Sequence, residues 1–129
     1  MPDNARIERF LPHDPIVQRA AVVVCHGGMG ITQRALLNSV PPVIVPFGRD
    51  QHEVARRVEH AGAGVSLRPK KLSPGRLRQA VEEARGRANG ALRIAEAFRE
   101  AGGDVRAADL VEGLPQRGRD ETVSSSTAR

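Results

Sequence analysis

The sequence predicts an α/β fold, in which a parallel β-sheet with flanking helices is followed by a helical C-terminal part. Short apolar runs alternate with amphipathic segments in the middle of the chain, in the order strand, helix, strand, helix, strand. That alternation is typical of parallel sheets covered by helices. After residue 73, apolar side chains recur at helical spacing. The chain has 129 residues, which is enough for one domain with its own core.

The N-terminal segment contains extended and turn-forming stretches. Residues 6–10 alternate polar and apolar side chains, which indicates an edge strand. Residues 11–15 hold two prolines and an aspartate and predict a turn, and residues 16–19 suit a single helical turn. Residues 21–25 form a continuous apolar run, which is typical of a strand buried on both faces.

A helix and a second buried strand follow. We expect the helix over residues 32–39, with Leu36 and Leu37 on its inner side. Two consecutive prolines end it, and residues 43–45 form the second buried strand.

The next helix is expected over residues 50–61, where Val54 and Val58 lie four residues apart on one face. Glycines end this helix, and residues 65–67 form the third strand.

The last third of the chain is predicted to be helical. Ser73 can cap a helix whose first residue is Pro74. Gly86 and Gly90 interrupt the helical pattern. Three apolar faces are expected in turn: Leu77, Ala80, Val81 and Ala84; then Ile94, Ala97, Phe98 and Ala101; then Ala107, Leu110, Val111 and Leu114. Residues 115–129 have no apolar periodicity and are interpreted as a disordered tail, which leaves residues 1–114 as the domain.

Composition excludes several classes of protein. The single cysteine, Cys25, cannot form an internal disulfide and fits a reducing cytoplasm. No apolar run reaches the roughly 18–20 residues that span a bilayer, and the first residues do not form a signal peptide. The net charge is +5, but the arginines are interleaved with acidic residues. The chain contains three Phe and neither Trp nor Tyr. We therefore expect a cytoplasmic protein that binds neither membranes nor nucleic acid.

A glycine-rich turn, His-Gly-Gly-Met-Gly at residues 26–30, follows the first buried strand and begins a helix. Ligands of parallel α/β sheets bind beyond the carboxyl ends of the strands. Glycines let the backbone approach a ligand, and free N–H groups at a helix N-terminus favour a phosphate. His26 adds a donor. The alternative is that the glycines only form a tight turn and that His26 is a polar residue at a strand end.

Asp50 and Gln51 follow the second buried strand and are expected at the same edge of the sheet. An adjacent carboxylate and amide can bind the vicinal hydroxyls of a sugar. The alternative is that Asp50 is only the N-cap of the next helix, and one residue can do both.

Taken together, the glycine turn, Val-Pro-Pro-Val-Ile-Val-Pro at residues 40–46 and the Asp50–Gln51 pair resemble the C-terminal domain of GT-B nucleotide-sugar glycosyltransferases. The likeness is to the bacterial natural-product (macrolide and antibiotic) type, which is related to the UDP-glycosyltransferases. It begins at residues 6–13, extends to residues 107–111 and so covers nearly everything except the tail. It implies a partial Rossmann-like GT-B donor-binding domain.

The resemblance also implies roles for individual residues. Asp50 and Gln51 hold hydroxyls of the transferred sugar, and Phe10 and His13 lie near the nucleotide base. The donor diphosphate is bound at His26, Gly27, Gly28, Met29 and Gly30. No catalytic residue, metal site or cofactor is identified, and the UDP- or dTDP-linked donor is a substrate.

Three positions depart from the family pattern. Ile31 replaces a frequent hydroxyl residue, Arg34 stands where many members have a glutamate that binds ribose, and Val54 replaces a frequent asparagine. Arg34 cannot accept a hydrogen bond from ribose, although it can pair with a phosphate. These changes bear on the affinity and identity of the nucleotide.

The resemblance implies an inverting transfer of a hexose to an acceptor hydroxyl, with this chain as the donor-binding part. Family enzymes carry the acceptor site and catalytic base in an N-terminal domain, and we expect that domain, or a partner subunit, to be missing here. His52 and His60 lie on a predicted helix and are not convincing bases. The alternatives are a truncated, non-catalytic nucleotide-sugar or phosphate binder, and the donor subunit of a split enzyme. A homo-oligomer is a further alternative for a small sheet with open edges.

Overall fold

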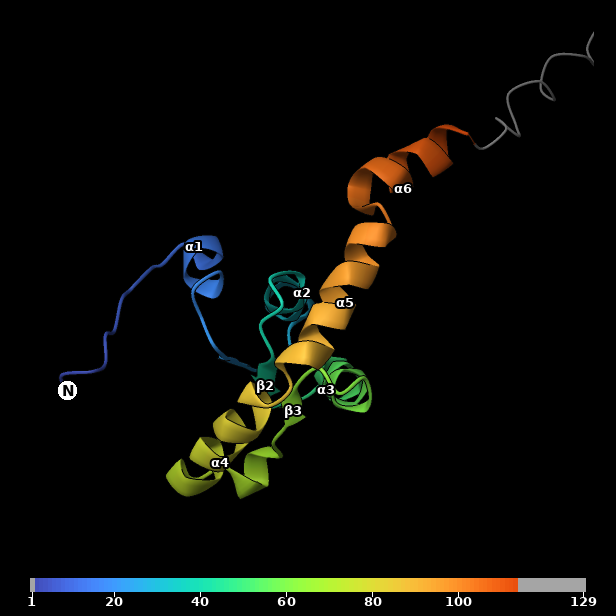
Figure 1. The fold of residues 1–129 in the computed structure, drawn as a ribbon. Coiled ribbons are helices and arrows are strands. Elements are labelled where there is room, and N and C mark those ends of the chain that lie inside the picture. The colour runs from blue at the N-terminus through green and yellow to red at the C-terminus, as the bar shows by residue number, and fades with distance from the viewer. Residues whose placement is uncertain (1, 114–129) are drawn as a thin grey trace, which may run out of the picture.

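A three-stranded parallel sheet lies at the centre of the molecule, as described by a computed structural model that covers residues 2–113 (Figure 1). Its strands are β1 (Val23–Cys25), β2 (Pro42–Ile44) and β3 (Val65–Ser66), in that order across the sheet. Val43 pairs with Val24 on one side and with Val65 on the other. The predicted α/β fold with a parallel sheet is confirmed.

The central strand β2 forms the core because its side chains alternate between two covered faces. Ile44 and Val43 are both 0 % exposed and belong to different clusters. Ile44 packs with residues of α2 (Met29–Leu37), α3 (Gln51–His60) and α5 (Ala88–Glu100). Val43 packs with residues of α4 (Pro74–Arg85). Helices therefore cover both faces of the sheet, which explains the continuous apolar sequence of this strand.

Strand β1 is less buried than its sequence predicted. Val24 is 49 % exposed, so the expectation of burial on both faces is wrong. The strand lies at the edge of the sheet, and α4 packs on β2 and β3. Val24 pairs with Val43 and points to the same face, but it lies beyond the part that α4 covers.

The N-terminal segment also differs from the prediction. Residues 6–10 form no strand, and β1 pairs only with β2 among the described strands. Helix α1 (His13–Val17) begins three residues before the helical turn that we expected. Asp14 lies in its first turn, where a negative charge is favourable, and Pro15 is tolerated there because first-turn N–H groups need no helical partner. Val17 anchors α1 in a small cluster with Ala35 of α2.

Helix α2 begins at Met29, within the glycine turn, and not at Thr32. Its inner side is formed by Thr32, Ala35 and Leu36. Leu37 is 49 % exposed, so its predicted inward position is wrong. Consecutive residues point about 100° apart around a helix, and only Leu36 of the two leucines falls on the buried side.

Helices α3 and α4 follow the prediction closely. In α3, Val54 and Val58 are buried as expected. In α4, the Ser73 hydroxyl accepts a hydrogen bond from the Arg76 N–H at 3.3 Å, and Pro74 is the first residue. The predicted face of α4 packs in the core cluster that contains Val43, and Ala84 is fully buried there. A short 3-10 helix, Pro69–Lys71, precedes this cap.

Gly90 was expected to interrupt the helical pattern, but it lies inside α5. A Cβ at this position would lie 1.9 Å from the carbonyl oxygen of Gly62. The absence of a side chain therefore lets α5 approach the backbone that follows α3. This tertiary contact outweighs the low helix propensity of glycine.

The buried face of α5 is partly different from the expected one. Ile94 and Phe98 pack against the core, but Ala97 and Ala101 are exposed, and Ala91 and Ala95 are buried instead.

Helix α6 (Gly103–Glu112) extends from the end of α5 away from the sheet and has no buried residue, so Ala107, Leu110 and Val111 are exposed (Figure 1). Leu114 and the proposed tail, residues 115–129, lie outside the described residues. No helix in residues 2–113 is long and apolar enough to cross a membrane.

The Gly90 contact makes a prediction about stability. We expect Gly90→Ala to lower the free energy of unfolding by at least about 1–3 kcal/mol, because the new methyl group overlaps the Gly62 carbonyl. Gly75→Ala is the matched control, since Gly75 is an exposed residue of α4 with open space around its Cβ position. It should change stability by no more than about 1 kcal/mol. Urea unfolding followed by circular dichroism measures both, and equal effects would contradict the proposed packing role.

Candidate functional site

The glycine turn and the Asp50–Gln51 pair lie together at the carboxyl ends of β1 and β2. Gly27 has a φ of +92°, a left-handed conformation that glycine adopts without strain. A Cβ on Gly27 would lie 2.7 Å from Cγ2 of Ile44 and 3.4 Å from the carbonyl oxygen of Gln51. The backbone of the turn therefore rests directly against the residue that begins α3. The structure brings together the two elements that the sequence singled out.

The turn presents the open N-terminus of α2. Gly28 is the N-cap and provides no side-chain cap, so the first N–H groups of α2 have no helical partner. The Thr32 hydroxyl donates to the Gly28 carbonyl oxygen at 2.9 Å and holds the turn from the buried side. Apart from its chain neighbours and the backbone of α2, no residue has an atom within 4 Å of a Cβ built on Gly30. The helix end is thus accessible to a ligand.

His26 lies over this helix end. A Cβ on Gly28 would lie 2.7 Å from Nε2 of His26, so the ring is folded back across the turn. His26 and Met29 are exposed, whereas Gly27 is buried. The imidazole and the free N–H groups of α2 therefore offer several hydrogen-bond donors around one small region.

The loop between β2 and α3 is held by Gln51. Its Oε1 accepts hydrogen bonds from the N–H groups of Phe47 at 2.9 Å and Gly48 at 3.3 Å. Arg49 in the same loop has a φ of +55°, which is unusual for a residue with a side chain. The loop is therefore fixed locally by a side chain and carries one residue in a strained conformation.

Asp50 occupies the N-cap position of α3 but makes no side-chain capping hydrogen bond. The interpretation of Asp50 as only a cap is thus not supported by the geometry. The residue is exposed. Its carboxylate is not used by the helix that it precedes, and the next residue, Gln51, lies against the glycine turn.

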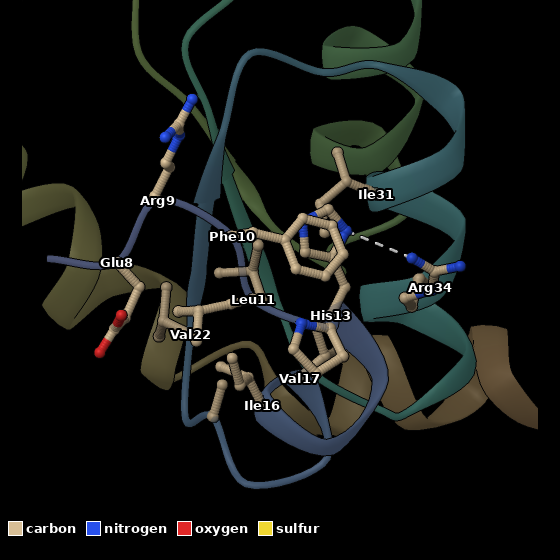
Figure 2. Close-up of a pocket in the computed structure, with 13 residues that line it drawn as sticks. Glu8, Arg9, Phe10, Leu11, His13, Ile16, Val17, Val22, Ile31 and Arg34 are labelled. Atoms are coloured by element: carbon tan, nitrogen blue, oxygen red, sulfur yellow. Dashed lines mark hydrogen bonds between the residues drawn. The ribbon is translucent and has the colours of Figure 1, made fainter.

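A separate hollow of about 690 Å³ lies between the N-terminal segment, α1, β1 and α2 (Figure 2). Its walls are mainly apolar, and Phe10, which is 83 % exposed, stands at its rim. His13 and Arg34 form a polar corner. The hollow contains both residues that the resemblance assigned to the nucleotide base, Phe10 and His13, and it includes Ile31 from the first turn of α2.

The polar corner contains a pairing that the sequence did not indicate. Arg34 Nε lies 2.7 Å from Oδ1 of Asp14, and Arg34 Nη1 lies 3.3 Å from Nδ1 of His13. The dashed line in Figure 2 marks the contact with His13. Arg34 is thus not a free cation in the described residues. Asp14 lies on α1 and Arg34 lies on α2, so no spacing along the sequence predicts this ion pair.

His26, Asp50 and Gln51 do not line this hollow. Ile31 connects the two regions, because it lies one residue after the glycine turn and also forms part of the hollow. An extended ligand would therefore reach both regions by passing the N-terminus of α2. His52 and His60 lie on α3 and are exposed. Residues 2–113 contain no group of three or more His, Cys, Asp or Glu that could hold a metal ion.

Within residues 2–113, the acid whose pKa is strongly perturbed is Glu53, in the first turn of α3. Hydrogen bonds from Arg56 at 2.9 Å and from Arg57 at 2.8 Å lower the pKa of Glu53 to about 2. The same pair raises the pKa of Arg56. All three side chains are solvent-accessible, so they form a surface network of the helix and do not point to an acid–base role.

A pH dependence follows from the lowered pKa of Glu53. The network stabilises the folded state above the ordinary carboxyl pKa of 4.5, and this contribution is lost as the pH falls toward about 2. Glu53→Gln should therefore be less stable than the wild type at pH 6, with a difference that shrinks between pH 5 and pH 2. Urea midpoints at several pH values measure it. Glu96→Gln is the control, since Glu96 is exposed on α5 and forms no ion pair with the described residues. A difference that does not change with pH would contradict the network.

Comparisons with known proteins identify relatives over most of the chain. The family model described as "Erythromycin biosynthesis protein CIII-like, C-terminal domain" matches residues 1–117. The 4'-demethylrebeccamycin synthase of Lentzea aerocolonigenes is 39 % identical over 118 residues, which are 88 % of this chain and 28 % of the relative. A protein of Bacillus subtilis named uncharacterized UDP-glucosyltransferase YojK is 35 % identical over 121 residues, which are 91 % of this chain and 30 % of the relative.

A solved structure agrees with these matches. The glycotransferase of kitacinnamycin superimposes with a TM-score of 0.83 at 34 % identity, covering 89 % of this chain and 31 % of that structure. The chain thus spans about 30 % of the length of the proteins that it resembles.

Proposed function

Because this chain belongs to the erythromycin biosynthesis protein CIII-like C-terminal domain family of GT-B glycosyltransferases, we propose that it binds the nucleotide-sugar donor of an inverting sugar transfer. The observation that supports this most directly is the close approach of Gly27 to Gln51, which leaves no free space for a side chain between them. It joins an anion-binding helix end to a pair of groups suited to sugar hydroxyls, within one small region of the sheet edge.

The diphosphate of the donor binds at the glycine turn. The free N–H groups at the start of α2 and the positive end of its dipole favour phosphate oxygens. The backbone at Gly30 is open to a ligand, and His26 adds a donor beside Gly28. During transfer the acceptor oxygen forms a bond to the anomeric carbon as the bond to the diphosphate breaks, the hydroxyl proton goes to the catalytic base, and negative charge develops on the leaving group. His26 and the helix end stabilise that charge.

The transferred sugar lies toward α3. The Asp50 carboxylate is exposed and free of the helix, so it can accept a hydrogen bond from a hydroxyl group. Gln51 lies beside it, with its backbone against Gly27. A sugar attached to a diphosphate at the glycine turn is therefore within the neighbourhood of both side chains.

The nucleotide base occupies the hollow next to Phe10. The hollow has the volume and the mostly apolar walls of a small-molecule site, with a polar corner at His13 and Arg34. It adjoins the diphosphate region through Ile31. The name of the Bacillus subtilis relative supports UDP as the nucleotide, and dTDP has the same diphosphate and a closely similar base.

The complete reaction needs groups outside the part of the family that this chain covers. The chain spans about 30 % of the length of its relatives. The acceptor site and the catalytic base therefore come from a further domain or a partner subunit. The reaction takes place in the cytoplasm, which agrees with the single thiol of Cys25.

The diphosphate and sugar assignments predict different binding losses. Calorimetry with UDP, dTDP and their glucose conjugates should show that His26→Ala weakens every ligand, by about 10-fold or more, because one donor to a charged group is lost. Asp50→Ala should leave UDP unchanged and remove about 5- to 10-fold of the extra affinity of the sugar conjugate.

Two exposed residues provide matched controls for these variants. His60→Ala is the control for His26→Ala, since His60 lies at the far end of α3. Asp109→Ala is the control for Asp50→Ala, since Asp109 lies on α6. Neither should change any affinity. If a well-folded wild type binds none of the four ligands, the proposed function is wrong. If it binds them but His26→Ala and Asp50→Ala resemble their controls, the residue assignments are wrong.

The base assignment is tested at Phe10. Stacking of a base on an aromatic ring contributes about 1–3 kcal/mol, so Phe10→Ala should weaken UDP and UDP-glucose equally, by about 5- to 150-fold. Ile7→Ala is the control, since Ile7 is also exposed in the N-terminal segment but does not line the hollow. Equal calorimetric affinities for the two variants would place the base elsewhere.

A further inference from the structure

Gln51 contacts its own loop in a way that its assignment to sugar hydroxyls does not require. Its side-chain oxygen accepts from two main-chain donors, the N–H groups of Phe47 and Gly48. Its own N–H donates to the Gly48 carbonyl oxygen at 3.2 Å. The loop is therefore closed onto Gln51 from both the side chain and the main chain.

We infer that Gln51 is a positioning residue, which fixes the loop that presents Asp50 and can offer a bound sugar only a hydrogen-bond donor. The inference rests on the proposed function and deepens it. It assigns opposite hydrogen-bonding roles to two adjacent side chains, and it identifies the loop, Phe47 to Asp50, as a part of the sugar site that one amide group holds in place.

The orientation of the Gln51 amide follows from its partners. Main-chain N–H groups donate, so the atom that faces both Phe47 and Gly48 must be the oxygen. The nitrogen, Nε2, then lies on the other branch of the amide and can only donate. An amide free in solution can offer either group by rotating, but rotation here would break two hydrogen bonds and oppose donors to donors.

Asp50 completes the pair. An ionised carboxylate can only accept, and Asp50 makes no capping bond in α3. The two side chains therefore match a pair of neighbouring hydroxyls, one of which donates to Asp50 while the other accepts from Gln51. The site should favour sugars with two free vicinal hydroxyls and bind poorly those in which one of them is removed.

Positioning is needed because the backbone of the loop adopts an unfavourable conformation at one residue. Arg49 has a φ of +55°, and residues other than glycine rarely adopt this conformation. Arg49 directly precedes Asp50, so relaxation of its backbone would redirect the carboxylate. The two hydrogen bonds to Gln51 oppose that relaxation, and the contact of Gln51 with Gly27 ties the loop to the diphosphate turn.

Two substitutions separate positioning from donation. Gln51→Glu keeps oxygen acceptors for Phe47 and Gly48 but has no donor. Gln51→Met has similar length and neither group. Amide hydrogen exchange of the full ligand-free chain, measured by NMR, should show slow exchange at Phe47 and Gly48 in the wild type and in Gln51→Glu. In Gln51→Met, exchange at both amides should be faster by about 5- to 10-fold. Gln79→Met, on the exposed face of α4, is the control and should change neither amide.

Binding supplies the second measurement. The affinity of UDP-glucose relative to UDP isolates the contribution of the sugar. It should fall by about 5- to 10-fold in Gln51→Glu, because the donor is lost, and further in Gln51→Met, where the donor is lost and Asp50 is also no longer held. Asp50→Ala should lower it further in Gln51→Glu, where the loop is kept. It should have little added effect in Gln51→Met, where Asp50 is no longer held.

The two measurements fail separately. If UDP does not bind to the folded wild type, the proposed function and the donor role of Gln51 both fail, while hydrogen exchange still decides whether Gln51 holds the loop. If UDP and UDP-glucose bind but Gln51→Met leaves the exchange of Phe47 and Gly48 unchanged, the positioning role is overturned. If Gln51→Glu retains the full sugar contribution, the donor role is overturned.

Discussion

The candidate site depends on one close approach of backbone, in which Gly27 fits between the sheet and the start of α3. Its left-handed φ of +92° and the 2.7 Å that would separate a Cβ from Ile44 both require glycine. Because Gly27 has no side chain, the turn after β1 can rest on the residue that follows the loop after β2. Any larger residue would strain the turn and separate the helix end of α2 from Asp50 and Gln51.

Two other glycines allow similarly close approaches of backbone elsewhere in the fold. A Cβ on Gly64 would lie 2.4 Å from the Pro42 carbonyl oxygen, and one on Gly90 would lie 1.9 Å from that of Gly62. These contacts bring β3 close to the central strand and α5 close to the segment after α3. The sheet has only three short strands, so its rigidity comes from this close packing around fully buried Val43 and Ile44 and not from a large area of strand pairing. Polar groups at its carboxyl edge can therefore be exposed without being loosely held.

Local sequence patterns predicted what depends on local physics, and they failed where distant segments decide. The apolar run of β2 and the Ser73 cap could be read directly, since burial and capping act within a few residues. The exposure of Val24 could not, because it depends on which strand lies at the edge of the sheet. Gly90 has the local pattern of a helix breaker, and only its contact with a distant backbone explains its place in α5.

The site divides in the same way, and Arg34 is the clearest case. The meeting of the glycine turn with Gln51 followed from the rule that parallel strands end at one edge. The residue type at position 34 suggested a side chain that can pair with a phosphate, but Asp14 lies 2.7 Å from Arg34 Nε on a helix that the sequence pattern placed wrongly. The two charges largely cancel, so the corner of the hollow gains hydrogen-bonding groups of both kinds and little net positive charge. The ion pair is exposed, which limits its contribution to stability but leaves both groups accessible. Recognition in this corner therefore depends on the geometry of hydrogen bonds more than on attraction of an anion, whereas the helix end at the glycine turn attracts charge.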